Sequence, residues 1–358
     1  MLTFANRVGL IIMWNYGNER FKNMEKKTKK ILIFGEKAEK SSPSLTLLNL
    51  LLAHGYIAEC NDLPDNSLNC LKFFSEYDIA FFIFYKKPSD WLIKKIALAN
   101  FVNTKIYRYW VGSDVLLACE NLDWLPNIKK LDKFITKNIT VAFHLSEELL
   151  TIGIESCTVP LVPSSYPPIC NRWSQEISRS ILVYLPKGRE SFYGGEILES
   201  LFLKNKNFKF IVVANDSDKY QTYNNVESYG WIEDMESIYS RVGSVLRITR
   251  HDGLPRMILE SLARGRYVIY SWPLEGCYFA GKLDEISACL DDIKNKNSYN
   301  VSGSEYVRSE YSSKKSMEKL SVALKNNNVS KMKKTIRSCY LLASLVLEKI
   351  IKKSSYNR

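Results

Sequence analysis

The feature that most constrains the fold is an alternation of short apolar segments with segments of helix length, which runs through the chain twice. Such alternation is typical of βαβ units, in which helices cover both faces of a parallel sheet. The sequence therefore predicts an α/β protein with two parallel sheets. The predicted strands are 30–35, 56–60, 79–85, 105–110, 140–144 and 158–162 in the first series, and 181–185, 208–214, 226–229, 244–249 and 266–271 in the second.

A proline-rich stretch separates the two series, with prolines at 160, 163, 167 and 168. A chain of 358 residues exceeds the size at which one hydrophobic core usually stops growing, so two domains are expected. The predicted organisation is a basic extension at 1–28, a Rossmann-like domain at 29–165, a second such domain at 166–328 and a basic amphipathic helix at 329–358.

Residues 247–271, RITRHDGLPRMILESLARGRYVIYS, combine a strand end, a polar turn, a short helix and another strand. Pro255 suits the first helical position and Gly265 suits the end of the helix. Parallel sheets bind ligands at the carboxyl ends of their strands, where a helix N-terminus can hold a phosphate. A nucleotide fits this arrangement, with Asp252 facing a sugar and Glu260 facing a ribose. An ordinary turn and capped helix explains the spacing equally well.

This segment resembles the acidic signature of retaining glycosyltransferases of family 4, which have the GT-B fold. The family pattern is Glu, seven residues, Glu, and then small residues before a strand. Here Asp252 and Glu260 stand at the acidic positions, and Ala263 and Gly265 at the small ones. Asp252 departs from the family's first Glu, which shortens the reach of this carboxylate towards a donor sugar.

The resemblance extends upstream in weaker form. Residues 230–239 are similar to the strand, glycine loop and helix that contact the nucleobase in the family. Residues 182–196 are similar to a strand and a loop that carries a basic pair for the donor diphosphate. Residues 110–114 resemble a tryptophan, glycine and aspartate turn of some members.

The resemblance implies two Rossmann-like domains whose sheets face a central cleft. It also implies a glycosyltransferase of hexosyltransferase type that moves a sugar from a nucleotide-diphosphate sugar to a glycan or lipid-linked acceptor with retention of configuration. The candidate catalytic residues are Asp252, Lys187 and Arg189. The candidate donor-binding residues are Gly230, Trp231, Ile232, Arg250, His251, Gly253, Leu254 and Glu260. The candidate acceptor-binding residues are Gly35, Ser113 and Asp114, with Ser41, Ser42 and Ser44 in the loop after Gly35.

Several of these residues have a structural alternative. Lys187 and Arg189 fit a solvated basic loop equally well. His251 fits a hydrogen-bonding role within the turn, and Asp114 and the serines fit helix caps. Two other functions also remain open. One is an enzyme of this fold with a protein or modified nucleic acid as acceptor, and the other is a catalytically silent nucleotide-sugar or glycan-binding module.

The sequence argues against other chemistries. It has three histidines, and its eight cysteines form no CxxC pair, so no zinc site is expected and the thiols fit a reducing compartment. The GxSxG, GxGxxG and P-loop motifs are missing from the sequence. Residues 215–218 resemble the metal-binding DxD of the other glycosyltransferase fold, but their composition favours a loop. The resemblance implies no metal and no cofactor besides the nucleotide-sugar substrate.

The net charge of +12 comes from the two ends of the chain, residues 1–30 and 331–358. Between them basic and acidic side chains are equal in number, which argues against a nucleic-acid groove. Apolar residues at helical spacing from 336 to 351 predict a helix that packs on the first domain or docks on an anionic membrane surface. No apolar run is long enough to span a membrane, so a cytoplasmic location is predicted, with Met13 and Met24 as alternative starts.

Overall fold

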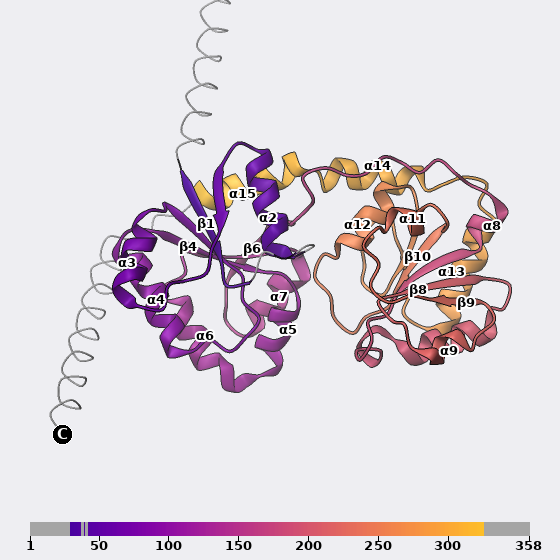
Figure 1. Cartoon of the computed structure of the whole chain (residues 1–358), viewed down its shortest axis with the longest axis horizontal. Helices are drawn as coiled ribbons and strands as arrows, with labels where there is room; N and C mark the ends of the chain where they lie inside the picture. The colour runs from indigo at the N-terminus through magenta and orange to yellow at the C-terminus, as the bar shows by residue number, and fades with distance from the viewer. Residues whose placement is uncertain (1–28, 37–38, 40–41, 326–358) are drawn as a thin grey trace, which may run out of the picture. The chain divides into compact units, whose positions relative to one another are not determined.

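The computed structural model describes residues 29–36, 39 and 42–325 (Figure 1). The predicted extension at 1–28, Ser41 and the predicted helix at 336–351 lie outside these residues. The chain divides into two compact units. The second unit is Ser165–Ser316, and the first unit combines the described residues before and after it.

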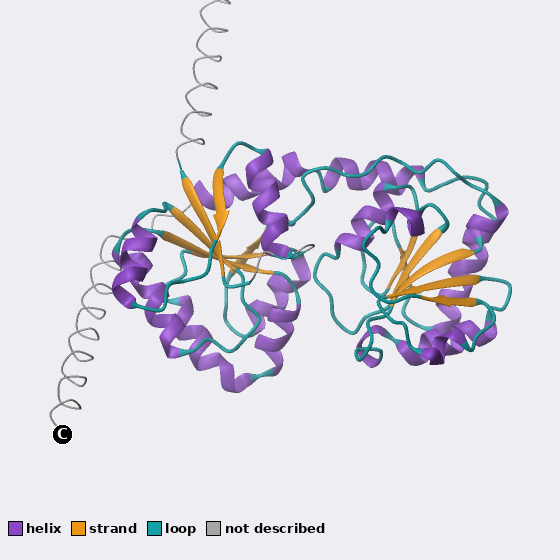
Figure 2. Ribbon diagram, in the orientation of Figure 1, coloured by secondary structure: helices purple, strands orange, loops and turns teal. Residues whose placement is uncertain are grey.

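The first unit contains a parallel sheet with the strand order β2-β1-β3-β4-β5-β6. The strands of both units are drawn in orange in Figure 2. Its strands are β1 (Lys30–Phe34), β2 (Ile57–Cys60), β3 (Ile79–Phe82), β4 (Lys105–Trp110), β5 (Lys137–Thr140) and β6 (Ser156–Thr158). Its helices are α2 (Pro43–Ala53), α3 (Ser67–Ser75), α4 (Asp90–Phe101), α5 (Ser113–Glu120), α6 (Leu125–Asp132) and α7 (Phe143–Thr151), with a short 3₁₀ helix at Leu122–Trp124.

Strands β1 and β3 in the interior of this sheet are apolar along nearly their whole length, as expected for parallel strands that are buried on both faces. All four residues of β3 are buried, and Leu32 of β1 lies opposite Ala80 of β3. Phe34 stacks on Phe82 with 5.0 Å between the ring centres. These strands form the core that fixes the loops at their carboxyl ends.

The second unit contains a parallel sheet with the order β12-β11-β10-β7-β8-β9. Its strands are β7 (Ser180–Tyr184), β8 (Lys209–Val213), β9 (Val226–Ser228), β10 (Ser244–Arg247), β11 (Tyr267–Tyr270) and β12 (Tyr278–Phe279). Its helices are α8 (Gln175–Ser178), α9 (Gly195–Lys204), α10 (Asp218–Gln221), α11 (Glu236–Tyr239), α12 (Arg256–Ala263), α13 (Leu283–Lys294) and α14 (Val301–Glu310), with a 3₁₀ helix at Ser191–Tyr193. Helices α9 and α13 pack in one core cluster with β7 and β8.

The predicted strand at 140–144 is wrong, because β5 ends at Thr140 and α7 begins at Phe143. The sequence of β5, KNIT, gives a weak strand signal. Its Asn138 is nevertheless buried, accepts a hydrogen bond from Trp110 Nε1 at 3.0 Å and donates one to Asp132 at 2.7 Å. These tertiary contacts override the low strand propensity of asparagine. The last strand of this sheet likewise lies at Ser156–Thr158, before the predicted 158–162.

The chain passes between the units within the proline-rich stretch, after Ser164. The sequence predicts that the second domain continues to residue 328, but the described residues after Ser316, 317–325, group with the first unit. They belong to helix α15 (Ser313–Lys325), in which Met317, Leu320 and Ala323 are buried. Tyr107 of β4 donates a hydrogen bond to the Leu324 carbonyl at 3.4 Å, so the end of α15 is part of the first unit.

Glu227 on β9 gives the second unit a pH-dependent contribution to stability. It forms ion pairs with Lys209 and Arg241. Burial raises the pKa of Glu227, but the hydrogen bonds from these cations outweigh burial and lower the pKa from 4.5 to about 2. A carboxyl with a lowered pKa stabilises the fold above its unfolded pKa, and this stabilisation is lost as the pH falls through the folded pKa.

We expect E227Q to lower the free energy of unfolding by about 1 kcal/mol at pH 7, and the difference from the wild type to shrink between pH 4.5 and pH 2. Urea denaturation at a series of pH values measures this difference. E196Q, at an exposed position in α9, is the control and should behave as the wild type. An E227Q difference that stays constant with pH would contradict the ion-pair explanation.

Candidate functional site

In each unit the strand order reverses at one place, and open parallel sheets bind ligands at this switch point. In the second unit it lies between β7 and β10, and in the first unit between β1 and β3. The loops that follow these strands leave the sheet in opposite directions at its carboxyl edge. Both loops that the sequence predicts to bind the donor diphosphate follow β7 or β10.

A hollow of about 420 Å³ lies at the switch point of the second unit. Residues 188–192 of the loop after β7 line it together with Arg250 after β10. The Arg250 amide donates to the Phe192 carbonyl at 3.0 Å, which joins the two loops. The guanidinium carbons of Arg189 and Arg250 lie 4.8 and 5.6 Å from the centre of the Phe192 ring. The structure therefore brings together two of the predicted cations around one hollow.

Lys187 is in the same loop and is paired with an acidic side chain. Its Nζ lies 2.8 Å from Asp216 Oδ1, and this hydrogen bond raises the pKa of Lys187. A Cβ atom added to Gly230 would lie 3.6 Å from Asp216, so the predicted nucleobase loop begins beside this pair. Trp231 in that loop is 69% exposed, and Ile232 is half-buried. Three loops, those after β7, β9 and β10, thus contribute predicted residues along one edge of the sheet.

Asp252 forms a buried ion pair with Arg247, the last residue of β10. Arg247 Nε donates to Asp252 Oδ2 at 2.5 Å, and the two side chains are 9% and 12% exposed. Burial lowers the pKa of Arg247, but the charge of Asp252 outweighs burial and the pKa is raised. The Gly253 amide donates to Asp252 Oδ1 at 3.1 Å. The carboxylate and the amide that the sequence predicts to face a donor therefore hold the turn together.

The rest of this turn is also packed within the unit. His251 is buried, and its carbonyl accepts a hydrogen bond from the Thr249 hydroxyl at 2.9 Å. The His251 ring meets Trp272 edge-on with 5.7 Å between the ring centres. These contacts favour the structural interpretation of His251. Leu254 is half-buried. Pro255 lies immediately before α12, whereas the sequence predicts it as the first residue of the helix.

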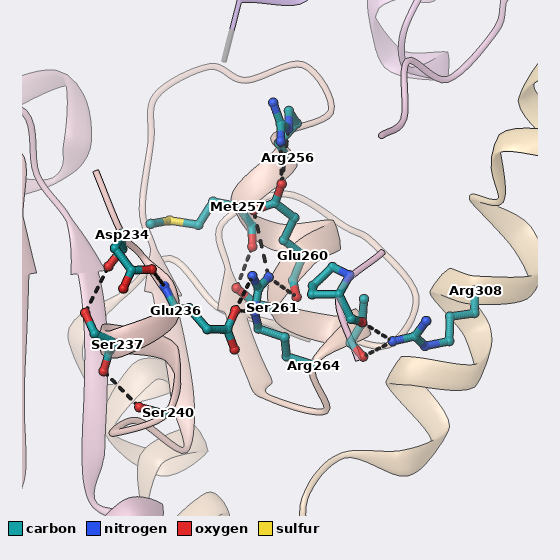
Figure 3. A network of polar contacts seen from close by, with 12 residues as sticks. Asp234, Glu236, Ser237, Ser240, Arg256, Met257, Glu260, Ser261, Arg264 and Arg308 are labelled. Atoms are coloured by element: carbon teal, nitrogen blue, oxygen red, sulfur yellow. Dashed lines mark hydrogen bonds and ion pairs between the residues drawn. The ribbon is translucent and has the colours of Figure 1, made fainter. Parts of the chain in front are cut away.

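Glu260 lies on α12 within a network of charged side chains (Figure 3). Its Oε1 accepts hydrogen bonds from Arg256 Nη2 at 2.7 Å and from Arg256 Nε at 3.2 Å. Arg264 Nη1 lies 3.9 Å from Glu260 Oε2, and Arg264 Nη2 donates to Glu236 Oε2 at 2.7 Å. Glu236 begins α11, directly after the predicted nucleobase loop. The network therefore connects two segments that the sequence assigns to the donor.

The partners in these ion pairs were not among the predicted residues. Arg256 and Arg264 stand four residues before and after Glu260, and this spacing places all three side chains on one side of a helix. That signal was available in the sequence. Arg247 is the one charged residue of β10, SVLR, and its pairing with Asp252 depends on the turn between them.

The candidate acceptor residues lie at the switch point of the first unit or beside it. Gly35 has a φ of +104°, and a Cβ atom added to it would lie 2.2 Å from the Ile83 carbonyl oxygen. Asp114 is buried, and its Oδ1 accepts hydrogen bonds from the amides of Val111, Gly112 and Val115 at 2.9 to 3.0 Å. This carboxylate therefore caps α5, while Ser113 is exposed at the start of the helix.

Two further groups near this switch point, Glu36 and Tyr85, were missed. Burial raises the pKa of Glu36, and Ser44 partly offsets it by donating both its amide and its hydroxyl to Glu36 Oε2 at 3.3 Å. The charge of Asp114 adds to the increase, and burial likewise raises the pKa of Tyr85. Among the described residues, Asp114 Oδ2 has no hydrogen-bond partner. Ser42 caps α2 through the Leu45 amide at 3.1 Å, as the structural alternative predicts.

Within the described part of the chain, no cluster of three or more His, Cys, Asp and Glu side chains has an arrangement that could bind a metal ion. Asp216 of the DxD-like segment pairs with Lys187, and Asn215 donates to Glu190 Oε1 at 2.9 Å. The described helices are also too short or too polar for any of them to cross a membrane.

The protein has the GT-B fold of solved glycosyltransferases. HepE from Anabaena, solved with UDP and glucose, is 12% identical and aligns over 83% of this chain and 99% of its own, with a TM-score of 0.62. Sucrose-phosphate synthase from Thermosynechococcus elongatus is 13% identical over 83% and 99% of the two chains, with a TM-score of 0.59.

TarM from S. aureus, solved as a mutant in complex with Fondaparinux, alpha-GlcNAc-glycerol and UDP, is 13% identical over 74% of this chain and 60% of its own, with a TM-score of 0.56. No family model and no curated protein matches the sequence. At these identities the likeness establishes the fold alone.

Proposed function

We propose that the protein is a glycosyltransferase that binds a nucleotide-diphosphate sugar in its second unit and moves the sugar to a hydroxyl of a glycan or lipid-linked acceptor. The observation that carries this proposal is the hollow at the switch point of that unit, where Arg189 and Arg250 flank one ring. Two cations at the carboxyl edge of a parallel sheet suit a diphosphate. HepE, which has the same fold, has been solved with UDP-glucose.

In this proposal Arg189 and Arg250 stabilise the charge that grows on the leaving diphosphate. Lys187 reaches the same group by leaving the exposed side chain of Asp216, and we assign the turn of Gly253 and Leu254 to that group as well. Glu260 accepts hydrogen bonds from the ribose hydroxyls. Trp231 and Ile232 face the base. Asp252, held by Arg247, shapes the turn that faces the donor sugar.

The proposed transfer breaks the bond between the sugar C1 and the diphosphate oxygen and forms a bond between C1 and the acceptor oxygen. The acceptor proton passes to the departing diphosphate. With retention, the acceptor attacks on the face from which the diphosphate leaves. We assign the acceptor to the carboxyl edge of the first unit's sheet, where Gly35, Ser113 and Asp114 lie. Glu36, whose pKa is raised by burial, belongs to the same region.

One observation favours the alternative of a catalytically silent binding module. Both carboxylate oxygens of Asp252 are engaged within the protein, by Arg247 and by the Gly253 amide. Incubation of the full chain with UDP-, GDP- and ADP-sugars, with and without alkyl glycoside acceptors, separates the two functions. Release of free nucleotide that increases with acceptor supports the enzyme. Binding without release supports the module, and the absence of any binding rejects both.

We expect E260A to weaken the binding of the cognate nucleoside diphosphate by about 10- to 100-fold, because hydrogen bonds from ribose to a charged acceptor are lost. Calorimetric titration measures this change. E260Q keeps the size of the side chain and removes its charge, and E305A, at an exposed position of α14, serves as the control. Wild-type affinity in both Glu260 variants would remove Glu260 from the donor site.

A further inference from the structure

We propose that Arg256 exchanges partners when the donor binds. It leaves Glu260, moves to the donor diphosphate and frees the Glu260 carboxylate for the ribose. This inference rests on the proposed function, because it assumes that a nucleoside diphosphate occupies the second unit. It adds Arg256 to the residues that recognise the donor.

The carboxylate of Glu260 is already occupied in the structure. Its Oε1 accepts both hydrogen bonds of the Arg256 guanidinium, at 2.7 and 3.2 Å, and the glutamate side chain is 21% exposed. A ribose presents two neighbouring hydroxyl donors, and a carboxylate binds such a pair best when both of its oxygens are accessible. In the structure one of these oxygens is already used by Arg256.

The two arginines that contact Glu260 differ in how firmly the protein holds them (Figure 3). Arg264 is 9% exposed, donates to Glu236 at 2.7 and 3.0 Å and lies 4.2 Å from the centre of the Tyr239 ring. The side chain of Arg256 is 39% exposed, and both of its hydrogen bonds go to Glu260. Arg264 is therefore fixed by several elements, whereas Arg256 can move at the cost of one pair.

Arg256 also has an unfavourable position in its helix. It is the first residue of α12, where the helix dipole disfavours a positive charge. An arginine four residues before a glutamate is also the less favourable order for an i,i+4 pair. Helix stability therefore does not explain this arginine. Residues that break a local rule of this kind are expected at functional sites, and an incoming diphosphate would supply the missing negative charge.

The test is calorimetric titration of the full chain with the diphosphate among UDP, GDP and ADP that the wild type binds most tightly, and with the matching nucleoside. We expect R256M to bind the diphosphate about tenfold more weakly and the nucleoside as tightly as the wild type or more tightly. R256K should recover part of the diphosphate affinity. R241M removes an exposed arginine that is paired with Glu227, and it should change neither affinity.

The same substitution in the E260Q variant tests whether its effect on nucleoside binding depends on the Glu260 carboxylate. In E260Q, the substitution R256M should still weaken diphosphate binding, but any gain in nucleoside binding should disappear because the carboxylate is gone. Equal loss of both ligands in R256M, or unchanged diphosphate binding, would overturn the exchange while leaving the donor site in place. A wild-type protein that binds none of the three diphosphates rejects the proposed function together with this inference.

Discussion

Replacement of Asp252 by alanine is expected to lower the free energy of unfolding of the second unit by about 3 to 5 kcal/mol, because it leaves Arg247 as an unpaired buried cation. The two side chains are 9% and 12% exposed, so water cannot take the place of the carboxylate. Urea denaturation monitored by tryptophan fluorescence measures the change. A loss below about 1 kcal/mol would mean that the guanidinium finds another partner or solvent.

A double variant separates the structural role of Asp252 from a role in transfer. Replacing a whole buried pair by apolar groups is often neutral, so R247M with D252A should recover most of the stability lost in D252A. If this variant folds and transfers sugar at the wild-type rate, Asp252 takes no part in the chemistry. If it folds, binds the donor and fails to transfer, the turn shaped by Asp252 is required for the reaction.

The G35A variant is expected to destabilise the first unit by about 3 kcal/mol or more. A Cβ atom at this position would lie 2.2 Å from the Ile83 carbonyl oxygen, and the backbone has a φ of +104°. The steric conflict and the backbone strain both involve the main chain. Ile83 directly follows β3 and is held in place because its amide donates to the Phe34 carbonyl at 3.1 Å. A side-chain rotation therefore cannot relieve the contact.

The matched control is G55A. Gly55 has a φ of +79°, and nothing lies within 4 Å of its added Cβ, so this variant carries the backbone strain without the steric conflict. We expect a loss of about 1 kcal/mol for G55A by urea denaturation. If G35A and G55A lose equal amounts, the close approach of the β1 and β3 loops does not constrain the switch point of the first unit.

The sequence predicted the strands that are mostly apolar or aromatic, such as β1, KILIF, and β4, KIYRYW. Strand β4 has the predicted bounds, and β1 ends one residue before the predicted end. Both strands lie between other strands, so their burial agrees with their apolar sequence. The prediction was wrong at β5, where burial of Asn138 depends on Trp110 and Asp132 from elsewhere in the first unit. The two-residue strand β12 has too short a pattern to be recognised.

The candidate site was predictable in its loops and only partly in its contacts. The turn after β10 and the end of α12 at Gly265 followed from local rules, and Gly265 has the left-handed φ of +75° that such a helix end requires. The pairs Lys187 with Asp216 and Arg264 with Glu236 join residues 29 and 28 positions apart. Local spacing gives no information on such pairs, so the resemblance could supply candidate residues but not their partners.

Helix α15 has a consequence for the order in which the protein can fold during synthesis. Synthesis runs from the N-terminus, and domains generally fold as units when their residues are available. The second unit is complete once Ser316 has been made, whereas the first still lacks Met317, Leu320 and Ala323, which are buried in the finished protein. The unit that begins first in the chain therefore reaches its final packing last, and an incomplete chain would expose part of its core.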